Sequence, residues 1–207
     1  GIRDDLVTGV QTCALPIYIA FTTDTRTDVD GAIALTGAGT VQLDAATITA
    51  AAGITTDGGL IDFDGAVIVD AGAATAIGTG GGAGNVVFDT TLALTAGGAD
   101  DLTITAGAGN VTFTGQVTIN DNDLTIASSD LVTITTGIGG STGNIAFTTD
   151  TRTDVDGAIA LTGAGTVQLD AATISAAAGI TTDGGLIDFD GAVIVDAGAA
   201  TEIGRAH

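Results

Sequence analysis

Closely spaced aspartates form the most chemically suggestive pattern in this 207-residue chain. The stretch DTRTDVDGA occurs at 24–32 and again at 150–158. Carboxylate oxygens are hard ligands of the kind that calcium prefers. The candidate metal ligands are therefore Asp24, Asp28, Asp30, Asp150, Asp154 and Asp156.

The alternative for both stretches is a solvated turn in which arginine partly neutralises its aspartate neighbours. An EF-hand alignment with Gly31 at loop position six puts Arg26 at position one and Gly37 at position twelve, where carboxylates belong. Aspartate next to glycine is also typical of turns. We therefore expect no cofactor, and calcium remains the open alternative.

Catalytic residue types are scarce in the chain. Between residues 19 and 201 there is no His, Cys, Glu, Lys or Tyr, so only Asp, Ser, Thr and two arginines remain for chemistry. Paired aspartates can do glycosidase-like work, but a duplicated sequence would duplicate such a site. The glycine-rich GTGGGAG at 78–84 lacks the GK[ST] ending of a phosphate loop, which favours a wide corner. We predict that the chain is not an enzyme.

Threonine pairs suggest a further ligand class. Flat threonine faces are found on ice-binding solenoids, although outward strand threonines are common in ordinary sheets. The pairs are Thr103/Thr105, Thr112/Thr114 and Thr133/Thr135.

The charge balance excludes some partners. The chain has 25 acidic and 4 basic residues, a net charge of -21. Nucleic acid is not an expected partner, because a phosphate backbone requires a basic surface. No apolar run approaches the roughly 20 residues of a membrane-spanning helix, so we expect no membrane insertion of this segment.

A long internal repeat dominates the sequence. Residues 19–75 recur at 145–201, an offset of 126, and differ only where Thr49 becomes Ser175. Near-identity of this kind indicates recent tandem duplication. The repeat region, 18–202, is thus one unit at 19–144 followed by a partial second unit at 145–201.

Within the unit, a glycine-rich turn is repeatedly followed by alternating apolar residues. Examples are GTVQLD (39–44), GLIDFD (59–64), GNVVFD (84–89), GNVTFT (109–114) and GNIAFT (143–148). Alternation with a period of two, bounded by Gly, Asp or Asn, predicts short strands and turns. The first apolar residues, from Ile19 to Ile145, are separated by 22, 20, 25, 25 and 34 residues. This spacing predicts a parallel β-solenoid of about eight coils, with tandem β-sandwich repeats as the alternative.

Segments such as GNVTFTGQVTI and GAGNVVFDTTLAL resemble bacterial surface β-strand-repeat proteins of the filamentous-haemagglutinin and autotransporter-passenger kind. The resemblance covers 19–201 and implies a right-handed parallel β-helix in a secreted, elongated stalk or adhesin. It also implies an extracellular or cell-surface location and partners such as a surface ligand, a glycan, or neighbouring repeats. A calcium-, glycan- or ice-binding module is the alternative function.

The two ends differ from the rest in composition. They hold the only Cys, Pro, Tyr, Glu and His of the chain. Residues 1–4 and 7–17 can be coded by the two constant parts of a common sequencing adapter, with residues 5–6 in a gap of the size of its index, and residues 203–207 by the start of the same adapter on the other strand. We therefore expect both segments, 1–17 and 203–207, to be non-native, with the true termini, any signal peptide and any anchor outside this sequence. Tyr18 and Glu202 stand where the other unit has Asn144 and Ala76, as hybrid junction codons would produce.

Overall fold

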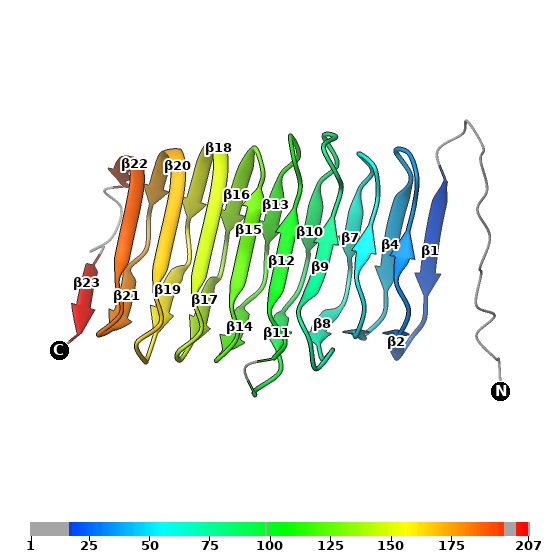
Figure 1. The fold of residues 1–207 in the computed structure, drawn as a ribbon, viewed down its shortest axis with the longest axis horizontal. Helices are drawn as coiled ribbons and strands as arrows, with labels where there is room; N and C mark the ends of the chain where they lie inside the picture. The colour runs from blue at the N-terminus through cyan, green and yellow to red at the C-terminus, as the bar shows by residue number, and fades with distance from the viewer. Residues whose placement is uncertain (1–16, 98, 197–201, 207) are drawn as a thin grey trace.

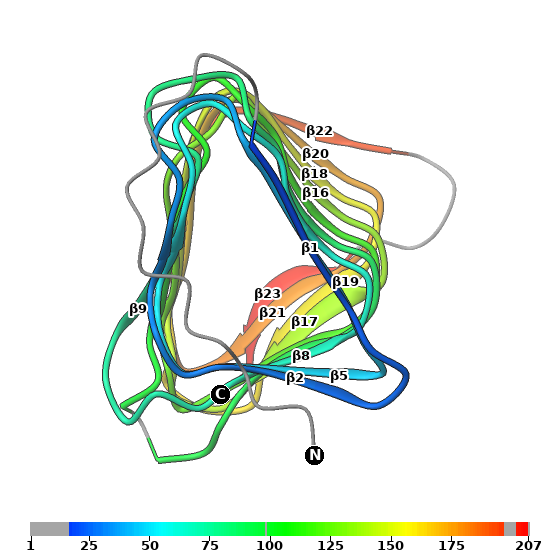
Figure 2. The same ribbon diagram turned by 90° about the vertical axis from the view of Figure 1, so that its right-hand side faces the viewer.

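The chain forms a right-handed parallel β-helix with a triangular cross-section. The computed structural model describes residues 17–97, 99–196 and 202–206, and in these ranges the regular elements are 23 strands and no helix. All pairings between these strands are parallel. Seen from its N-terminal side, the chain runs clockwise and away from the viewer (Figure 2). The expected solenoid is confirmed, the β-sandwich alternative is wrong, and the strands stack into about nine coils (Figure 1).

Each coil contributes one strand to each of three faces. Face 1 consists of β1 (Tyr18–Thr22), β4 (Thr40–Asp44), β7 (Ile61–Phe63), β10 (Val86–Phe88), β13 (Val111–Phe113) and β16 (Leu131–Ile134). Face 2 consists of β2 (Arg26–Val29), β5 (Thr47–Ala50), β8 (Ala66–Val69), β11 (Leu92–Leu94), β14 (Val117–Asn120), β17 (Gly137–Gly140), β19 (Ala158–Leu161), β21 (Ile180–Asp183) and β23 (Ile203–Ala206). Face 3 consists of β3 (Ile33–Ala34), β6 (Ile54–Thr55), β9 (Thr75–Gly78), β12 (Leu102–Thr105) and β15 (Leu124–Ser128).

Three long strands join faces 3 and 1 across a corner. They are β18 (Ile145–Val155), β20 (Val167–Ala176) and β22 (Ile187–Val195). The first part of β18 pairs with β15 on face 3, and its second part pairs with β16 on face 1. A register shift between Thr149 and Arg152 marks the corner. Faces 1 and 3 therefore merge into one 14-stranded sheet, while face 2 is a separate 9-stranded sheet.

The core is a set of apolar columns that run along the solenoid axis. Alternate residues of each short strand point inward, so stacked coils place like residues above one another. On face 1 the rings of Phe63, Phe88 and Phe113 stack with centroid separations of 4.8 and 5.3 Å. On face 3, Ile54, Ile77 and Ile104 form a similar column. The buried side chains of successive coils thus form one continuous core.

The structure corrects one expected coil boundary. The sequence pattern pairs Val111 with Ile145 as successive strand starts, 34 residues apart. In the structure Val111 stacks on Val132, whereas Ile145 stacks on Leu124 of another face. The 34-residue interval is therefore more than one coil.

The two repeat units are related by a screw, not by a translation alone. From β1 to β16 the chain makes five coils on face 1, and β17 and the start of β18 add two further faces. Ile19 therefore lies on face 1, while its counterpart Ile145 lies on face 3. Equivalent residues of the two units therefore differ by a rotation about the solenoid axis as well as by a translation along it. Identical sequence fits different faces because each face offers the same apolar column and strand spacing.

A column of glycines allows the coils to approach closely where face 1 begins. A Cβ added to Gly59 would lie 1.6 Å from the Gly39 carbonyl oxygen, and one on Gly84 would lie 2.2 Å from that of Gly59. A real Cβ cannot occupy such positions without moving the backbone. This close approach explains why glycine precedes the apolar pair in the repeated motif.

The structure describes only part of the two terminal segments that are expected to be non-native. Residues 1–16, expected to be non-native, lie outside the described residues. Residues 203–206, also assigned to a non-native segment, form β23, in which Ile203 pairs with Ile180 as Ile77 pairs with Ile54. Among the described residues, no helix is long and apolar enough to cross a membrane.

Candidate functional site

Three carboxyl groups gather on face 1 at the third and fourth coils. One carboxylate oxygen from each of Asp62, Asp64 and Asp89 lies within 4.8 Å of the others, and they form the one such acidic group among the described residues. Asp62 points outward from β7 because its neighbours Ile61 and Phe63 point into the core. Asp64 directly follows β7 on the same face, and Asp89 directly follows β10 in the next coil.

Burial and mutual repulsion perturb these acids. Desolvation by burial, followed by the charges of Asp64 and Asp89, raises the pKa of Asp62 to about 6. Burial, a hydrogen bond with Asp64 and the charge of Asp64 raise the pKa of Asp89. Gln42 of the preceding coil donates from Nε2 to Asp64 Oδ2 at 2.7 Å. Asp62 and Asp89 therefore bind protons more readily than isolated surface aspartates do.

Such an arrangement has two chemical uses in proteins. Clustered carboxylates bind hard cations, and an acid of raised pKa beside an ionised one is the pair that glycosidases use. Acidic side chains also cluster on many surfaces without binding an ion, so the cluster alone defines no site. The chain's second GLIDFD sequence places Asp188 and Asp190 in β22, with no aspartate stacked above them among the described residues.

The sequence contains a signal for this cluster that differs from the DTRTDVDGA pattern. GTVQLD, GLIDFD and GNVVFD all have aspartate in the sixth position. Because coils stack in register, Asp64 and Asp89 at two of these sixth positions become neighbours in space, whereas Asp44 is not part of the group. Asp62 joins them from the fourth position of GLIDFD. The ligand candidates thus come from adjacent coils and not from one contiguous stretch.

The six predicted metal ligands are not brought together as a group by the described structure. Asp24 lies between β1 and β2, Asp28 lies in β2, and Asp30 follows β2; all three are exposed. Arg26 Nε bonds Asp28 Oδ1, an ion pair between exposed side chains. In the first unit the stretch therefore has the geometry of a strand and its flanking turns.

The second copy repeats this arrangement on another face. Arg152 Nε bonds Asp154 Oδ1 within β18, and Asp154 is largely buried. Asp150 at the corner and Asp156 after the strand are exposed. The ion pair raises the pKa of Arg152, through its hydrogen bond to Asp154 first and the charge of Asp154 second. Arginine thus neutralises the adjacent aspartate in both units.

The threonine pairs align only over short distances. Thr112 stacks on Thr133, and Thr103 stacks on Thr125. The outward column of face 1 that contains the first pair continues as Val87 on one side and Asp154 on the other. A flat array of threonines therefore does not extend along this face.

Polar side chains form a ladder along the corner between faces 2 and 3. Asp101 Oδ1 accepts the Asp123 N–H at 2.8 Å, and Asp123 Oδ1 accepts the Asn144 N–H at 2.8 Å. Asn144 Oδ1 in turn accepts the Thr166 N–H at 3.0 Å and its hydroxyl at 2.8 Å. Tyr18 takes the place of Asn144 in the first unit. The asparagine of the GN motif therefore has a structural role in joining coils.

Asp100 forms a second network of hydrogen bonds at the same corner. Asp100 Oδ1 accepts the N–H groups of Ala71 and Gly72 at 2.9 and 2.7 Å, and Oδ2 accepts the Thr95 hydroxyl. Asn122 Oδ1 accepts the Asp100 N–H at 2.9 Å. Burial alone raises the pKa of Asp100, but the bonds from Thr95, Gly72 and Ala71 outweigh it and lower the pKa. Asp100 thus holds two coils together as a carboxylate.

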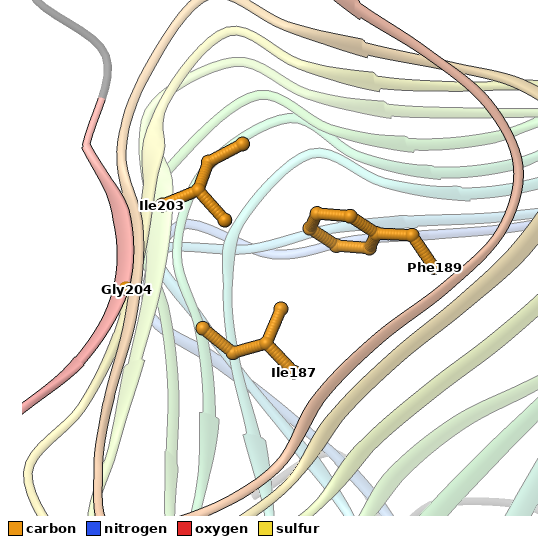
Figure 3. Close-up of a pocket in the computed structure, with 4 residues that line it drawn as sticks. All are labelled: Ile187, Phe189, Ile203 and Gly204. Carbon is orange, nitrogen blue, oxygen red and sulfur yellow. The ribbon is translucent and has the colours of Figure 1, made fainter.

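A pocket lies at the C-terminal end of the solenoid and not at the acidic cluster. It is lined by Ile187, Phe189, Ile203 and Gly204, and the side chains of the first three face the open interior of the last coil (Figure 3). Its lining contains no acid, base or nucleophile. The glycine-rich segment at 78–84 lies at the corner between β9 and β10, as expected.

Comparisons with known proteins do not identify a family. No protein-family model matches the chain, and no curated protein or solved structure matches it significantly.

Proposed function

We propose that this chain is a structural and adhesive repeat segment of a large secreted or cell-surface bacterial protein, without catalytic activity. The observation that carries the proposal is the continuous core of about nine coils, which makes an elongated body from a short repeated sequence. A solenoid of this kind gains length by adding coils, since each coil contacts only its neighbours.

The surface chemistry supports the same proposal. Acidic, Thr-rich faces keep an elongated body solvated, and the net charge of -21 opposes non-specific association. The ladder of Asp101, Asp123 and Asn144 and the Asp100 network hold successive coils together, so much of the polar chemistry is structural. An extracellular location belongs to the proposal, together with neighbouring repeats and a surface glycan as partners.

Two measurements test the structural and adhesive parts separately. Small-angle X-ray scattering of proteins with one, two and three added 126-residue units should show a rod that lengthens in proportion to unit number. Binding of the purified chain to a glycan panel should be saturable and stronger for tandem copies, because linked sites bind with avidity. Compact particles would contradict the proposed structural role. No binding to any glycan would contradict the proposed adhesion to glycans.

The alternative is a ligand-binding module for calcium, a glycan or ice. The calcium version is favoured by the proximity of Asp62, Asp64 and Asp89. Calorimetry should then detect calcium binding that Asp89→Asn removes and Asp150→Asn retains. Binding lost only with Asp150→Asn would instead favour the DTRTDVDGA stretch. No heat and no change in melting temperature with calcium would remove the calcium version.

An enzymatic role has its own test. A glycosidase using Asp62 as the acid and Asp64 or Asp89 as its partner would release reducing sugar from a polysaccharide panel, and Asp62→Asn would abolish that release. We expect no release from the parental chain. The ice version predicts thermal hysteresis, which the short threonine columns do not favour.

A further inference from the structure

We propose that tandem copies of the 126-residue unit present each of their surface features on the three faces of the solenoid in turn. A partner that recognises one unit then meets the next copy of its site on a different face. Separate soluble molecules can therefore surround the rod, whereas a flat surface engages one unit in three. The inference rests on the proposed function in one respect, since it requires units in tandem.

The shift from the first unit to the second is the same on every face. Three buried residues and their buried counterparts show this. They are Val41 on face 1 and Val167 on face 3, Ile48 on face 2 and Ile174 on face 1, and Ile54 on face 3 and Ile180 on face 2. The second unit therefore repeats the fold of the first after a rotation by one face.

Surface side chains follow the same rotation. Strand β4 presents Gln42 and Asp44 outward on face 1, alternating with buried residues. Their counterparts on β20, Gln168 and Asp170, are exposed on face 3. The GLIDFD sequence likewise lies on face 1 at β7 and on face 3 at β22. A site built on this surface thus keeps the order of its side chains and changes its face.

The cause of the rotation is the number of strand positions in one unit. Seventeen positions, β1 to β17, precede the start of β18, where the second unit begins, and each coil takes three of them. Because seventeen is not a multiple of three, each unit ends two faces beyond a whole number of coils. Successive units therefore begin on faces 1, 3 and 2, and the fourth unit begins on face 1 again after seventeen whole coils.

The rise of the coils gives the spacing of such sites. With strands about 4.8 Å apart, neighbouring units are displaced by roughly 27 Å along the axis, and units on the same face by roughly 80 Å. The stack turns only gradually from coil to coil (Figure 2), so neighbouring coils keep the direction of each face. A bound molecule broader than the displacement of neighbouring units would block the next site of a one-sided array. Rotation to another face relieves this exclusion and favours bulky soluble partners.

A distance measurement in the full chain tests the rotation. Spin labels on Asp44→Cys and Asp170→Cys mark equivalent exposed residues of the two units, and Cys13→Ser removes the other thiol. The control pair is Asp44→Cys with Asp156→Cys. Asp156 is exposed on face 1, five coils beyond Asp44 in one column of hydrogen-bonded strand ends.

Pulsed electron–electron double resonance should give a clearly longer distance for the equivalent pair than for the control pair. The control positions are about 24 Å apart along the axis, and the equivalent positions differ by only two-thirds of a coil more, about 3 Å. A larger excess therefore measures the rotation, and an excess no larger than this rise would overturn the proposal. Circular dichroism checks the fold, and Gln42→Cys with Gln168→Cys is a second equivalent pair if a first variant loses its sheet signal.

Tandem arrays test the display itself. Chains extended to four complete units, with one biotinylated cysteine per unit at the position of Asp44, can be labelled with monovalent streptavidin. Electron micrographs should show neighbouring labels on different sides of the rod. A single row of labels on a rod that lengthens with unit number would overturn this inference and leave the proposed structural role intact. Compact particles would instead contradict the structural role, and the distances in the full chain would still decide the rotation.

Discussion

The rings of Phe63 and Phe88 stack in neighbouring coils with centroids 4.8 Å apart and planes 6° apart. This separation equals the spacing of hydrogen-bonded strands, about 4.7–4.9 Å. Ring stacking and backbone pairing therefore stabilise the same geometry. Phe189, the counterpart of Phe63 in the second unit, is half-buried and has no ring stacked above it in the described structure.

Phe63 and Phe189 have the same neighbours in sequence, so replacing each of them in turn tests how much the stacked core stabilises the fold. Phe63→Ala should lower the free energy of unfolding by about 3–5 kcal/mol, because it leaves a cavity between two stacked coils. Phe189→Ala should cost clearly less, since its site is already open. Urea unfolding monitored by circular dichroism measures both, and equal losses would contradict the stacked core.

Asp62 should make stability depend on pH between the unfolded and folded pKa values. Its pKa rises from 3.8 in the unfolded chain to about 6 in the folded protein. The folded state therefore binds more protons in this window, and the contribution of Asp62 to stability falls as pH rises through it. Asp62→Asn should raise the melting temperature at pH 7 more than at pH 4.

Asp188→Asn is the control for that substitution. Asp188 has the same neighbours in sequence but lies exposed in β22, without the overlying Asp89. Its replacement should change the melting temperature little at either pH. Equal effects of the two substitutions would show that the stacked carboxylates are not the cause.

Close approach of backbones predicts a strong difference between two glycines of one loop. A Cβ at position 84 would lie 2.2 Å from the Gly59 carbonyl oxygen, whereas one at position 81 meets nothing within 4 Å. Gly84→Ala should therefore destabilise the protein by about 1–3 kcal/mol, the usual cost of overpacking. Gly81→Ala should be nearly neutral. Thermal unfolding distinguishes them, and a neutral Gly84→Ala would contradict the glycine column.

Asp100 should stabilise the protein as a carboxylate. Its pKa is lowered in the folded state, so its contribution is present above the unfolded pKa of 3.8 and is lost as pH falls through the lower folded value. Asp100→Asn should cost about 1–3 kcal/mol at pH 7, because hydrogen bonds to a charged acceptor are lost. The exposed Asp70→Asn is the control in urea unfolding, and an equal effect of both would refute the role of the network.

Part of this structure could be predicted from local pattern. Alternating residues such as Val86 and Phe88, bounded by Gly84 and Asp89, indicate strands because every second side chain must point inward. Glycine before the apolar pair indicated turns and proved to mark sites of backbone contact. The parallel solenoid follows from repeating such units at near-constant spacing.

The acidic cluster could not be found from contiguous sequence. Asp64 and Asp89 are 25 residues apart, and only the coil register places them side by side. The DTRTDVDGA stretch is dense in aspartate, yet an extended strand rises about 3.3 Å per residue, so aspartates two or more positions apart are spread along it. In a solenoid, the separation of two residues in the sequence is therefore a poor guide to their distance in space.

By itself the sequence determined the repeat, the strands, the turns and the solenoid class, because these depend on side-chain alternation and glycine within a few residues. Only the tertiary structure decided which face each strand occupies and which coil lies above it. Ile19 and Ile145 show the difference, since identical sequence lies on faces 1 and 3. The physical reason is that face assignment depends on the summed lengths of all preceding coils, which no local interaction specifies.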